Sequence, residues 1–429
     1  MGSKHCGIPL VWRILFGFVL GMAFGLAAPK LLGAEGTEKA VNIASPFGAV
    51  LVSMLKMVVY PIILFSLILG AASLPLKKSG RVGGSVLIWY FATSLFATIF
   101  GVVMAFLLNP TIRAASDTAS QYMDSAKAMA GNSGAASFGD FLVALFQNPF
   151  TSLANGQFLP IIIFSILFGF AARYLLDASG ADAKGNYSIE LLIKVCDGAQ
   201  KVSFKLIDWV MLYFPFGVFA LTFTNFAKHG VLLFGPYVRI VVCVMIGVLA
   251  MILVVYPLAI AVFCRENPYR ILSRIRQPIL TAFVTRSSAA TLPVSFRAMD
   301  EAGVPRAVSS FSLPLGATVN MDGVCIHLPV FVILAANMFG MHLNAIQLAM
   351  LVTSIMFASI GAGGVPGGSV FLLFMVLENM GLSGDQVATI VALALGINPI
   401  LDMFETSCNV TGDNVCTYIV AKNSGLKDE

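Results

Sequence analysis

The sequence predicts an all-α protein that crosses a membrane many times. Of its 429 residues, 58% are hydrophobic and only 11% are charged, whereas soluble domains carry about 25% charged residues. The mean hydropathy is +0.89, and apolar runs of about 20 residues, long enough to cross the hydrocarbon core, recur along the chain. The length has room for about eight such helices and some shorter pieces. Polar breaks interrupt the apolar runs in the last third, so we also expect two re-entrant helical hairpins.

The charge and the cysteines exclude several classes of function. The net charge of +5 comes from scattered loop residues and not from a basic run, so we expect no nucleic acid partner. The seven cysteines are spread over mostly apolar segments without a Cys-x-x-Cys pair, which is typical of small core residues. The histidines stand in no order typical of a catalytic triad, and we interpret His327 as a satisfied core residue. We therefore expect no enzyme.

The first 263 residues contain six apolar stretches. These are 12–28, 47–72, 86–108, 141–175, 191–226 and 231–263. Lys77, Lys78 and Arg81 lie between the second and the third, and the positive-inside rule then puts this loop and the N-terminus in the cytoplasm. We expect the polar segment 109–139 to be an external loop. The fourth stretch, which contains two prolines, is expected to be a segmented helix.

After residue 276 the apolar runs become about half as long. Two polar tips, 286–293 and 361–369, each lie between short apolar arms. The arms are 279–284 and 294–302 for the first tip, and 348–360 and 370–380 for the second. Half-length arms around a polar tip are typical of re-entrant hairpins, whose exposed backbone is tolerated only where it lines a cavity. Between the hairpins, the segment 316–323 has Asn320 and Asp322 between two glycines, which predicts an unwound turn whose carbonyls face a cation.

The segment 398–413 is the strongest candidate site. Four polar residues at steps of three, four and four share one face if the segment is a helix: Asp402, Glu405, Asn409 and Asp413. Charged side chains in a membrane cost roughly 3 kcal/mol each on insertion scales, so they hold a ligand or form a structural ion-pair cluster. We favour the ligand site. Oxygen donors without a His/Cys cluster indicate a hard cation such as Na⁺.

Four spaced motifs identify a family resemblance. They are residues 287–293 (SSAATLP), 320–323 (NMDG), 364–367 (GVPG) and 402–413 (DMFETSCNVTGD). Together they closely resemble those of the dicarboxylate/amino-acid:cation symporters, the glutamate transporter family, and the resemblance extends over nearly the whole chain. It implies a glutamate-transporter-like elevator fold with eight transmembrane helices and two re-entrant hairpins. It also implies a homotrimer in the lipid bilayer of a bacterial cytoplasmic membrane.

The resemblance divides the chain into a scaffold and a transport domain that moves across the membrane. Residues 1–82 are expected to form scaffold helices 1 and 2, and 111–228 the external loop with scaffold helices 4 and 5. Helix 3, in 83–110, is expected in the transport domain. Helices 6, 7 and 8 with both hairpins, in 229–429, would complete that domain.

The resemblance also implies three sodium ions, an amino-acid substrate and no organic cofactor. For the first ion the matching residues are Tyr90, Thr93, Ser94, Asn320 and Asp322. For the second they are Gly316, Asn320, Asn409 and Asp413, and for the third Thr318, Met321 and the backbone of the second hairpin. The α-amino group of the substrate is assigned to Asp402 and Thr406. Its α-carboxylate is assigned to Asn409 and to the hairpin tips at Ser288, Val365 and Gly367.

Three departures from the family pattern concern the substrate side chain. In the family that this chain resembles, members that carry acidic substrates have Arg at the position of Glu405, Asp at that of Asn398 and Thr at that of Val324. Two carboxylates about 4 Å apart repel by about 4 kcal/mol at an effective dielectric near 20, so glutamate and aspartate should bind poorly. The pattern is most similar to the bacterial serine/threonine:sodium symporters, which vary at the position of Asp322.

The sequence therefore predicts a sodium-coupled symporter of small neutral amino acids, serine and threonine first. One alternative is uptake of cationic amino acids that pair with Glu405. Another is a passive ion channel that uses the same acidic stripe. Two local alternatives to side-chain recognition are a structural bridge between Glu405 and Arg286, and a protonated Glu405 that acts only as a donor.

Overall fold

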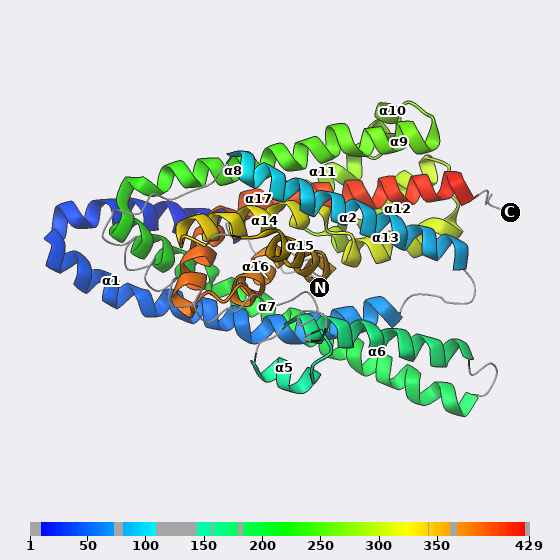
Figure 1. Ribbon diagram of the computed structural model, residues 1–429, viewed down its shortest axis with the longest axis horizontal. Coiled ribbons are helices and arrows are strands. Elements are labelled where there is room, and N and C mark those ends of the chain that lie inside the picture. The colour runs from blue at the N-terminus through cyan, green and yellow to red at the C-terminus, as the bar shows by residue number, and fades with distance from the viewer. Residues whose placement is uncertain are drawn as a thin grey trace, which may run out of the picture.

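The protein is an all-α molecule in a computed structural model (Figure 1), and within the described residues every regular element is a helix. The structure describes residues 10–72, 80–108, 143, 145–155, 158–178, 183–341, 343–360 and 367–424. The α-helices of the first half are α1 (Leu10–Ala72), α2 (Gly80–Leu108), α5 (Pro149–Asn155), α6 (Phe158–Ala178), α7 (Ala183–His229), α8 (Phe234–Ala250) and α9 (Tyr256–Cys264). Those of the second half are α10 (Pro268–Arg274), α11 (Arg276–Thr285), α12 (Ser288–Glu301), α13 (Arg306–Val319), α14 (Asp322–Met338), α15 (Ala345–Ser359), α16 (Gly368–Asn379) and α17 (Gly384–Ser424).

Among the described residues, six helices are long and apolar enough to cross a membrane. The prediction of an all-α, multi-pass membrane protein is confirmed. The first two predicted spans both lie in α1, where the backbone leaves helical geometry at Gly33 (φ 69°, ψ −178°) and the chain reverses at the left end of Figure 1. The segmented fourth stretch is confirmed as α5 and α6. The predicted loop 109–139 lies outside the described residues.

The first part of α1 packs closely along α7 because glycine recurs at every fourth position. A Cβ atom at Gly21 would lie 2.6 Å from Phe219 O, and one at Gly25 would lie 2.7 Å from Phe223 O. Gly17 is equally close to the α7 backbone. Small residues with this spacing let two helix backbones approach each other in a membrane. Together with α6, these helices form the lower layer of Figure 1.

Helices α14 and α17 occupy the middle of the other layer. α14 packs against α2, α8, α15, α16 and α17, and α17 also packs against α11, α12 and α13. In the stretch Val308–Met338, 94% of the most apolar window is buried inside the protein. This stretch is therefore apolar because other helices surround it, and not because it faces lipid. The polar stripe of α17 points into the same interior.

Both predicted hairpins are present as paired helices, α11 with α12 and α15 with α16. At the first tip, Arg286 adopts the left-handed conformation (φ 53°), and Ser287 Oγ caps α12 by accepting a bond from Ala290 N at 3.2 Å. At the second, residues 361–366 lie outside the described residues and Gly367 (φ 80°) precedes α16. The first arm of each hairpin begins earlier than its predicted apolar run. Arg276 and Gln277 also join α11, and Ala345, Ile346 and Gln347 join α15 after the capping box of Asn344.

The break between α13 and α14 is narrower than expected. The sequence predicts unwinding over 316–323, but only Asn320 (φ −99°, ψ 84°) and Met321 (φ −111°, ψ 57°) leave helical geometry. The helical bond from Asn320 N to Gly316 O persists at 2.9 Å, and Cys325 N bonds Met321 O at 2.9 Å. α13 and α14 are thus complete helices on both sides of a two-residue joint.

Candidate functional site

The polar stripe of α17 is buried along its whole length. The exposed fractions are 4% for Asp402, 1% for Glu405, 4% for Asn409 and 3% for Asp413. Buried polar and charged groups need partners, because leaving one unpaired costs free energy. The partners of Asp402 come from the two hairpin tips, whereas those of Glu405, Asn409 and Asp413 come from α14 and from the joint before it. Together with their neighbours, these residues form two groups.

The first group joins α2 to the joint between α13 and α14. Thr93 Oγ1 donates to Asn320 Oδ1 at 3.1 Å, and Ser94 Oγ donates to Asp322 Oδ1 at 2.9 Å. The other oxygen of Asp322 accepts a bond from Tyr256 Oη at 2.7 Å. Two hydroxyls of α2 therefore meet the amide and the carboxylate at the joint.

Asp413 completes this group from the side of α17. Asn320 Nδ2 donates to Asp413 Oδ1 at 3.1 Å. Gly316 also lies here, since a Cβ atom on it would be 2.5 Å from Asp413 Oδ1 and 2.6 Å from Tyr90 Oη. Apart from Asn409, the residues that the sequence assigns to the first two sodium ions thus lie in one buried oxygen cluster.

The oxygen cluster has the chemistry that a small, hard cation requires. Asp322 and Asp413 are 0% and 3% exposed, and in the described part of the chain neither forms an ion pair with Lys, Arg or His. Uncompensated buried carboxylates are strongly destabilising, so a bound cation would offset their charge. The donors are carboxylate, amide and hydroxyl oxygens, which suit Na⁺ and not a transition metal.

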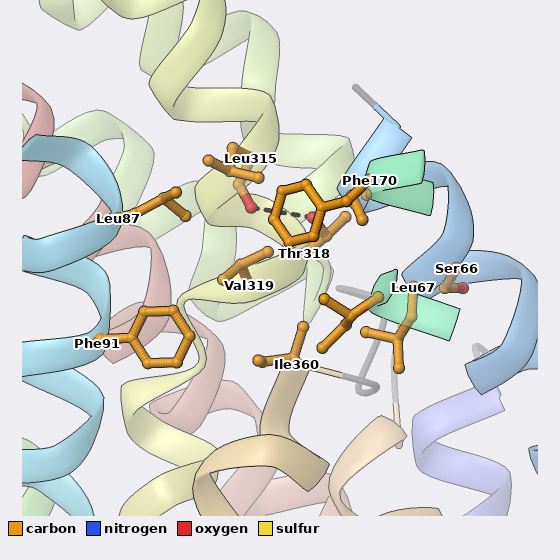
Figure 2. Close-up of a pocket in the computed structure, with 12 residues that line it drawn as sticks. Ser66, Leu67, Leu87, Phe91, Phe170, Leu315, Thr318, Val319 and Ile360 are labelled. Atoms are coloured by element: carbon orange, nitrogen blue, oxygen red, sulfur yellow. Dashed lines mark hydrogen bonds between the residues drawn. The ribbon is translucent and has the colours of Figure 1, made fainter. Parts of the chain in front are cut away.

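Asn409, Met321 and Thr318 are arranged differently. Asn409 Oδ1 accepts a bond from Gly323 N at 2.7 Å, and its Nδ2 lies 3.3 Å from Met321 Sδ. Thr318 Oγ1 instead donates to Leu315 O at 2.9 Å. The Thr318 side chain lines a cavity between α1, α2, α6 and α13 (Figure 2). Of the residues assigned to the third ion, Met321 therefore lies beside the stripe and Thr318 faces this cavity.

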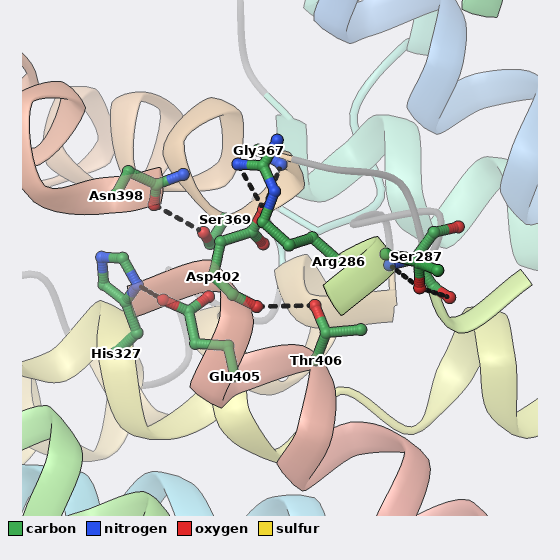
Figure 3. A network of polar contacts seen from close by, with 10 residues as sticks. Arg286, Ser287, His327, Gly367, Ser369, Asn398, Asp402, Glu405 and Thr406 are labelled. Carbon is green, nitrogen blue, oxygen red and sulfur yellow. Dashed lines mark hydrogen bonds and ion pairs between the residues drawn. The ribbon is translucent and has the colours of Figure 1, made fainter. Parts of the chain in front are cut away.

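The second group meets at Asp402, where both hairpins reach α17 (Figure 3). Gly367 N, from the second hairpin, donates to Asp402 Oδ2 at 3.0 Å. Arg286 Nη1, from the first, lies 3.6 Å from the same oxygen, and Arg286 is only 7% exposed. Thr406 Oγ1 donates to Asp402 O at 2.7 Å within α17. A carboxylate held between two hairpin tips could bind an ammonium group that both tips then cover.

The remaining predicted substrate residues are placed as follows. Ser288 is 2% exposed, and its Oγ has no hydrogen-bond partner among the described residues. Val324 is buried at the start of α14, and Val365 lies outside the described residues. Asn398 Oδ1 accepts a bond from Ser369 Oγ at 3.2 Å. Ser288 therefore keeps a free hydroxyl at the tip of the first hairpin.

Glu405 contacts His327, and not Arg286 (Figure 3). His327 Nδ1 lies against Glu405 Oε1, and the two side chains are 0% and 1% exposed. The alternative of a structural bridge between Arg286 and Glu405 is wrong, because the guanidinium pairs with Asp402 instead. His327 is buried in the core, as we interpreted it, and its Nδ1 contacts Glu405, but it is not fully satisfied, because its Nε2 has no partner within the described chain.

Sequence reasoning missed three features of the site. These are the position of His327, the pairing of Arg286 with Asp402, and the bond from Tyr256 to Asp322. Each involves a polar atom inside an apolar stretch or at a hairpin tip. A buried imidazole or phenol needs a hydrogen-bond partner, so the sequence predicts that a partner exists. It does not indicate which residue that partner is.

The sequence profile of the sodium:dicarboxylate symporter family matches residues 10–423. The chain belongs to this family. Members are transporters, so this chain is a multi-pass membrane transporter and not an enzyme. The family resemblance predicted from the four motifs is confirmed.

Relatives of this chain differ in what their names say they carry. It is 30% identical over 428 residues to a proton/glutamate-aspartate symporter of Escherichia coli, and the match covers 98% of this chain and 94% of that protein. It is 30% identical over 412 residues to a serine/threonine transporter of Bifidobacterium adolescentis, covering 95% and 88%. It is 31% identical over 440 residues to the human neutral amino acid transporter B(0), covering 94% and 78%. Sequence identity to these relatives therefore does not determine the substrate of this chain.

Proposed function

We propose that this symporter carries small neutral amino acids, serine and threonine first, together with sodium ions. This choice of substrate rests on Glu405, which is buried in α17 three residues after Asp402. If Asp402 binds the α-amino group, Glu405 is close enough to meet the substrate side chain. A carboxylate there repels a second carboxylate and accepts a hydrogen bond from a hydroxyl.

Sodium coupling is supported by the oxygen cluster around Asp322 and Asp413. Sodium ions would be held there by the two carboxylates together with the oxygens of Tyr90, Thr93, Ser94 and Asn320. Their charge would offset two buried negative charges. We propose three ions in all, the third near Met321 and Thr318, and no organic cofactor.

Two other functions deserve a test. Glu405 Oε2 is buried without a hydrogen-bond partner among the described residues, which favours a cationic substrate as the second candidate. A passive channel would use the same acidic residues. The meeting of both hairpins at Asp402 favours a site that closes over its ligand instead of a continuous pore.

The proposed transport mechanism is an elevator. Helices α1, α6 and α7, from 1–82 and 111–228, would form the scaffold. Helix α2, from 83–110, and α8 to α17, from 229–429, would form the domain that moves. The protein would work as a homotrimer in a bacterial cytoplasmic membrane, with its N-terminus in the cytoplasm.

The test is uptake of radiolabelled serine by purified protein in sealed liposomes. With high sodium outside and none inside, we expect saturable uptake that exceeds the equilibrium level and collapses when a sodium ionophore is added. A serine-independent, non-saturating sodium leak would contradict the proposal and favour the channel. Competition by unlabelled threonine, lysine and aspartate then ranks the three substrate classes.

A further inference from the structure

The buried pair of His327 and Glu405 is the feature of the site that the proposed function does not yet use. His327 Nδ1 contacts Glu405 Oε1, and both side chains are essentially inaccessible to solvent. Each partner keeps one polar atom, His327 Nε2 and Glu405 Oε2, without a hydrogen bond in the described chain. The ring of Phe331 lies 4.8 Å from the imidazole. The pair therefore has one hydrogen-bonded side and two unused polar atoms.

The pair is held in register by close contact between α14 and α17. A Cβ atom at Gly323 would lie 2.6 Å from Glu405 Cα, so the two helix backbones nearly touch there. Gly323 N also donates to Asn409 Oδ1 at 2.7 Å. His327 is one helical turn after Gly323, on the same face, and is thereby brought to Glu405. This contact follows from the backbone packing and does not require a flexible side chain to swing into place.

The charges around Glu405 leave His327 as its cationic partner. Asp402 lies one turn earlier on α17, and Arg286 pairs with it. Cys408, on α17 itself, lies close enough to interact with both Glu405 and Asp322. No Lys or Arg in the described residues forms an ion pair with Glu405. The net charge that Glu405 presents is thus set by whether the imidazole carries a second proton.

We infer that His327 sets the charge that Glu405 offers to the substrate side chain, so that the pocket accepts neutral hydrogen-bonding side chains and excludes cationic ones. This rests on the proposed function, in which Glu405 meets that side chain. With an imidazolium at His327 the pair is neutral, and Oε2 serves as an acceptor for a hydroxyl. With a neutral ring the pair keeps a full negative charge, which attracts a substrate ammonium. His327 is a positioning residue, because it acts through Glu405.

The ratio of lysine to serine affinity isolates this effect. Both amino acids carry the same α-amino and α-carboxylate groups, so changes at Asp402 or Arg286 affect the two affinities alike and cancel in the ratio. The ratio then reports only the side-chain end of the pocket.

The experiment compares His327→Gln with the double variant His327→Gln/Glu405→Gln, using lysine and serine as ligands of the purified full chain at saturating sodium. Glutamine still donates a hydrogen bond to Glu405 but never carries a charge. We expect the lysine-to-serine affinity ratio to rise about tenfold in His327→Gln and to fall back in the double variant, which has no carboxylate at this place.

Three outcomes would overturn the inference. They are an unchanged ratio in His327→Gln, a purely structural loss in which both ligands weaken equally, and a double variant that behaves like the single one. If His327→Gln does not fold, His327→Asn, which is also uncharged, is measured in its place, and an unchanged ratio again contradicts the inference. Sodium-driven serine uptake by the unmodified protein is measured in parallel, so failure of the proposed function is recognised separately.

Discussion

Asp413 is the residue that links α17 to the oxygen cluster through Asn320. Asp413→Asn keeps the shape of the side chain but removes a charge, so we expect sodium to bind more weakly. Hydrogen bonds to charged groups contribute about 1.5–3 kcal/mol, so the sodium concentration that gives half-maximal serine binding should rise about tenfold or more. Calorimetric titration with serine at several sodium concentrations measures this.

The matched control is Asp300→Asn, the same chemical change in a carboxylate that pairs with the exposed Arg306 at 2.6 Å. Asp300 lies near the end of α12, outside the oxygen cluster. It should leave the sodium dependence of serine binding unchanged. An Asp413→Asn protein with the same sodium dependence as Asp300→Asn would remove Asp413 from the ion site.

The polar stripe could be predicted from the sequence because helical spacing is a local property. The partners of its members could not. His327 and Glu405 are 78 residues apart in the sequence. Arg286 could pair with Asp402 or with Glu405, which are separated by a single helical turn. That choice depends on how deeply the first hairpin inserts against α17. No local pattern encodes this depth.

At the scale of elements, the contact between α14 and α17 depends on Gly323. A Cβ atom at this position would lie 2.6 Å from Glu405 Cα, and backbone atoms cannot move aside as a flexible side chain can. We expect Gly323→Ala to push the helices apart and to cost about 1–3 kcal/mol of stability. The apparent melting temperature of the protein in detergent should fall accordingly.

Gly84→Ala is the control for this change. Gly84 lies in α2 and has nothing within 4 Å of its ideal Cβ position. Alanine favours a helix over glycine, so the melting temperature should stay the same or rise. Equal melting temperatures for the two variants would mean that α14 and α17 tolerate a wider spacing than the structure has.

Glu266, between α9 and α10, joins these elements to the end of α17. Its carboxylate accepts a bond from Tyr418 Oη at 2.6 Å and pairs with Lys422 Nζ at 2.6 Å. The bond from Lys422, followed by that from Tyr418, lowers the pKa of Glu266. Because the folded-state pKa is depressed, this contribution to stability is fully present above the unfolded pKa of about 4.3. It is lost as the pH falls through the lower folded value.

Glu266→Gln should therefore destabilise the protein at neutral pH and have no effect in acid. The loss should be about 0.5 kcal/mol, because Glu266 and Lys422 are 37% and 46% exposed and the pair is screened. Thermal unfolding in detergent between about pH 3 and 7 measures it. Glu190→Gln, at an exposed position of α7, serves as the control. A loss that is constant over this pH range would mean that the charge of Glu266 does not stabilise the fold.

The elements themselves were predicted well where apolar runs define them and less well at their ends. The arms of the hairpins extend beyond the apolar runs because polar residues such as Arg276 and Gln277 continue the helix. The joint at Asn320 is shorter than the run of glycine and polar residues around it. Helical bonds persist wherever packing supplies partners, and this is a tertiary effect that composition does not report.

At the scale of the whole molecule, hydropathy predicts how many segments are apolar but not which of them are neighbours. The division into two layers follows from contacts such as Gly21 of α1 against Phe219 of α7. Between the layers lies a cavity of roughly 90 Å³ (Figure 2). It is lined by Leu67 from α1, Phe170 from α6 and Leu315 from α13, among others. In the elevator proposal, this boundary is where the moving domain slides past the scaffold.

A reversible cross-link across this boundary tests the elevator directly. Gly70 of α1 and Thr318 of α13 face each other, and a Cβ atom on Gly70 would lie 4.0 Å from Thr318 Oγ1. Cysteine side chains at these two positions would therefore be neighbours, and a disulfide joins two Cβ atoms about 3.5–4.5 Å apart. In a chain whose seven native cysteines are replaced, oxidation of Gly70→Cys/Thr318→Cys should stop serine uptake into liposomes.

If the bridge only prevents the two layers from moving past each other, serine should still bind in detergent, and a reductant should restore uptake. Thr318→Cys alone is the control, because Thr318 is also assigned to the third sodium ion and the loss of its hydroxyl must be measured by itself. Uptake that continues at full rate while the disulfide is formed would mean that α1 and α13 move together. The boundary between scaffold and transport domain would then have to lie elsewhere, and the placement of α13 with the moving helices would be wrong.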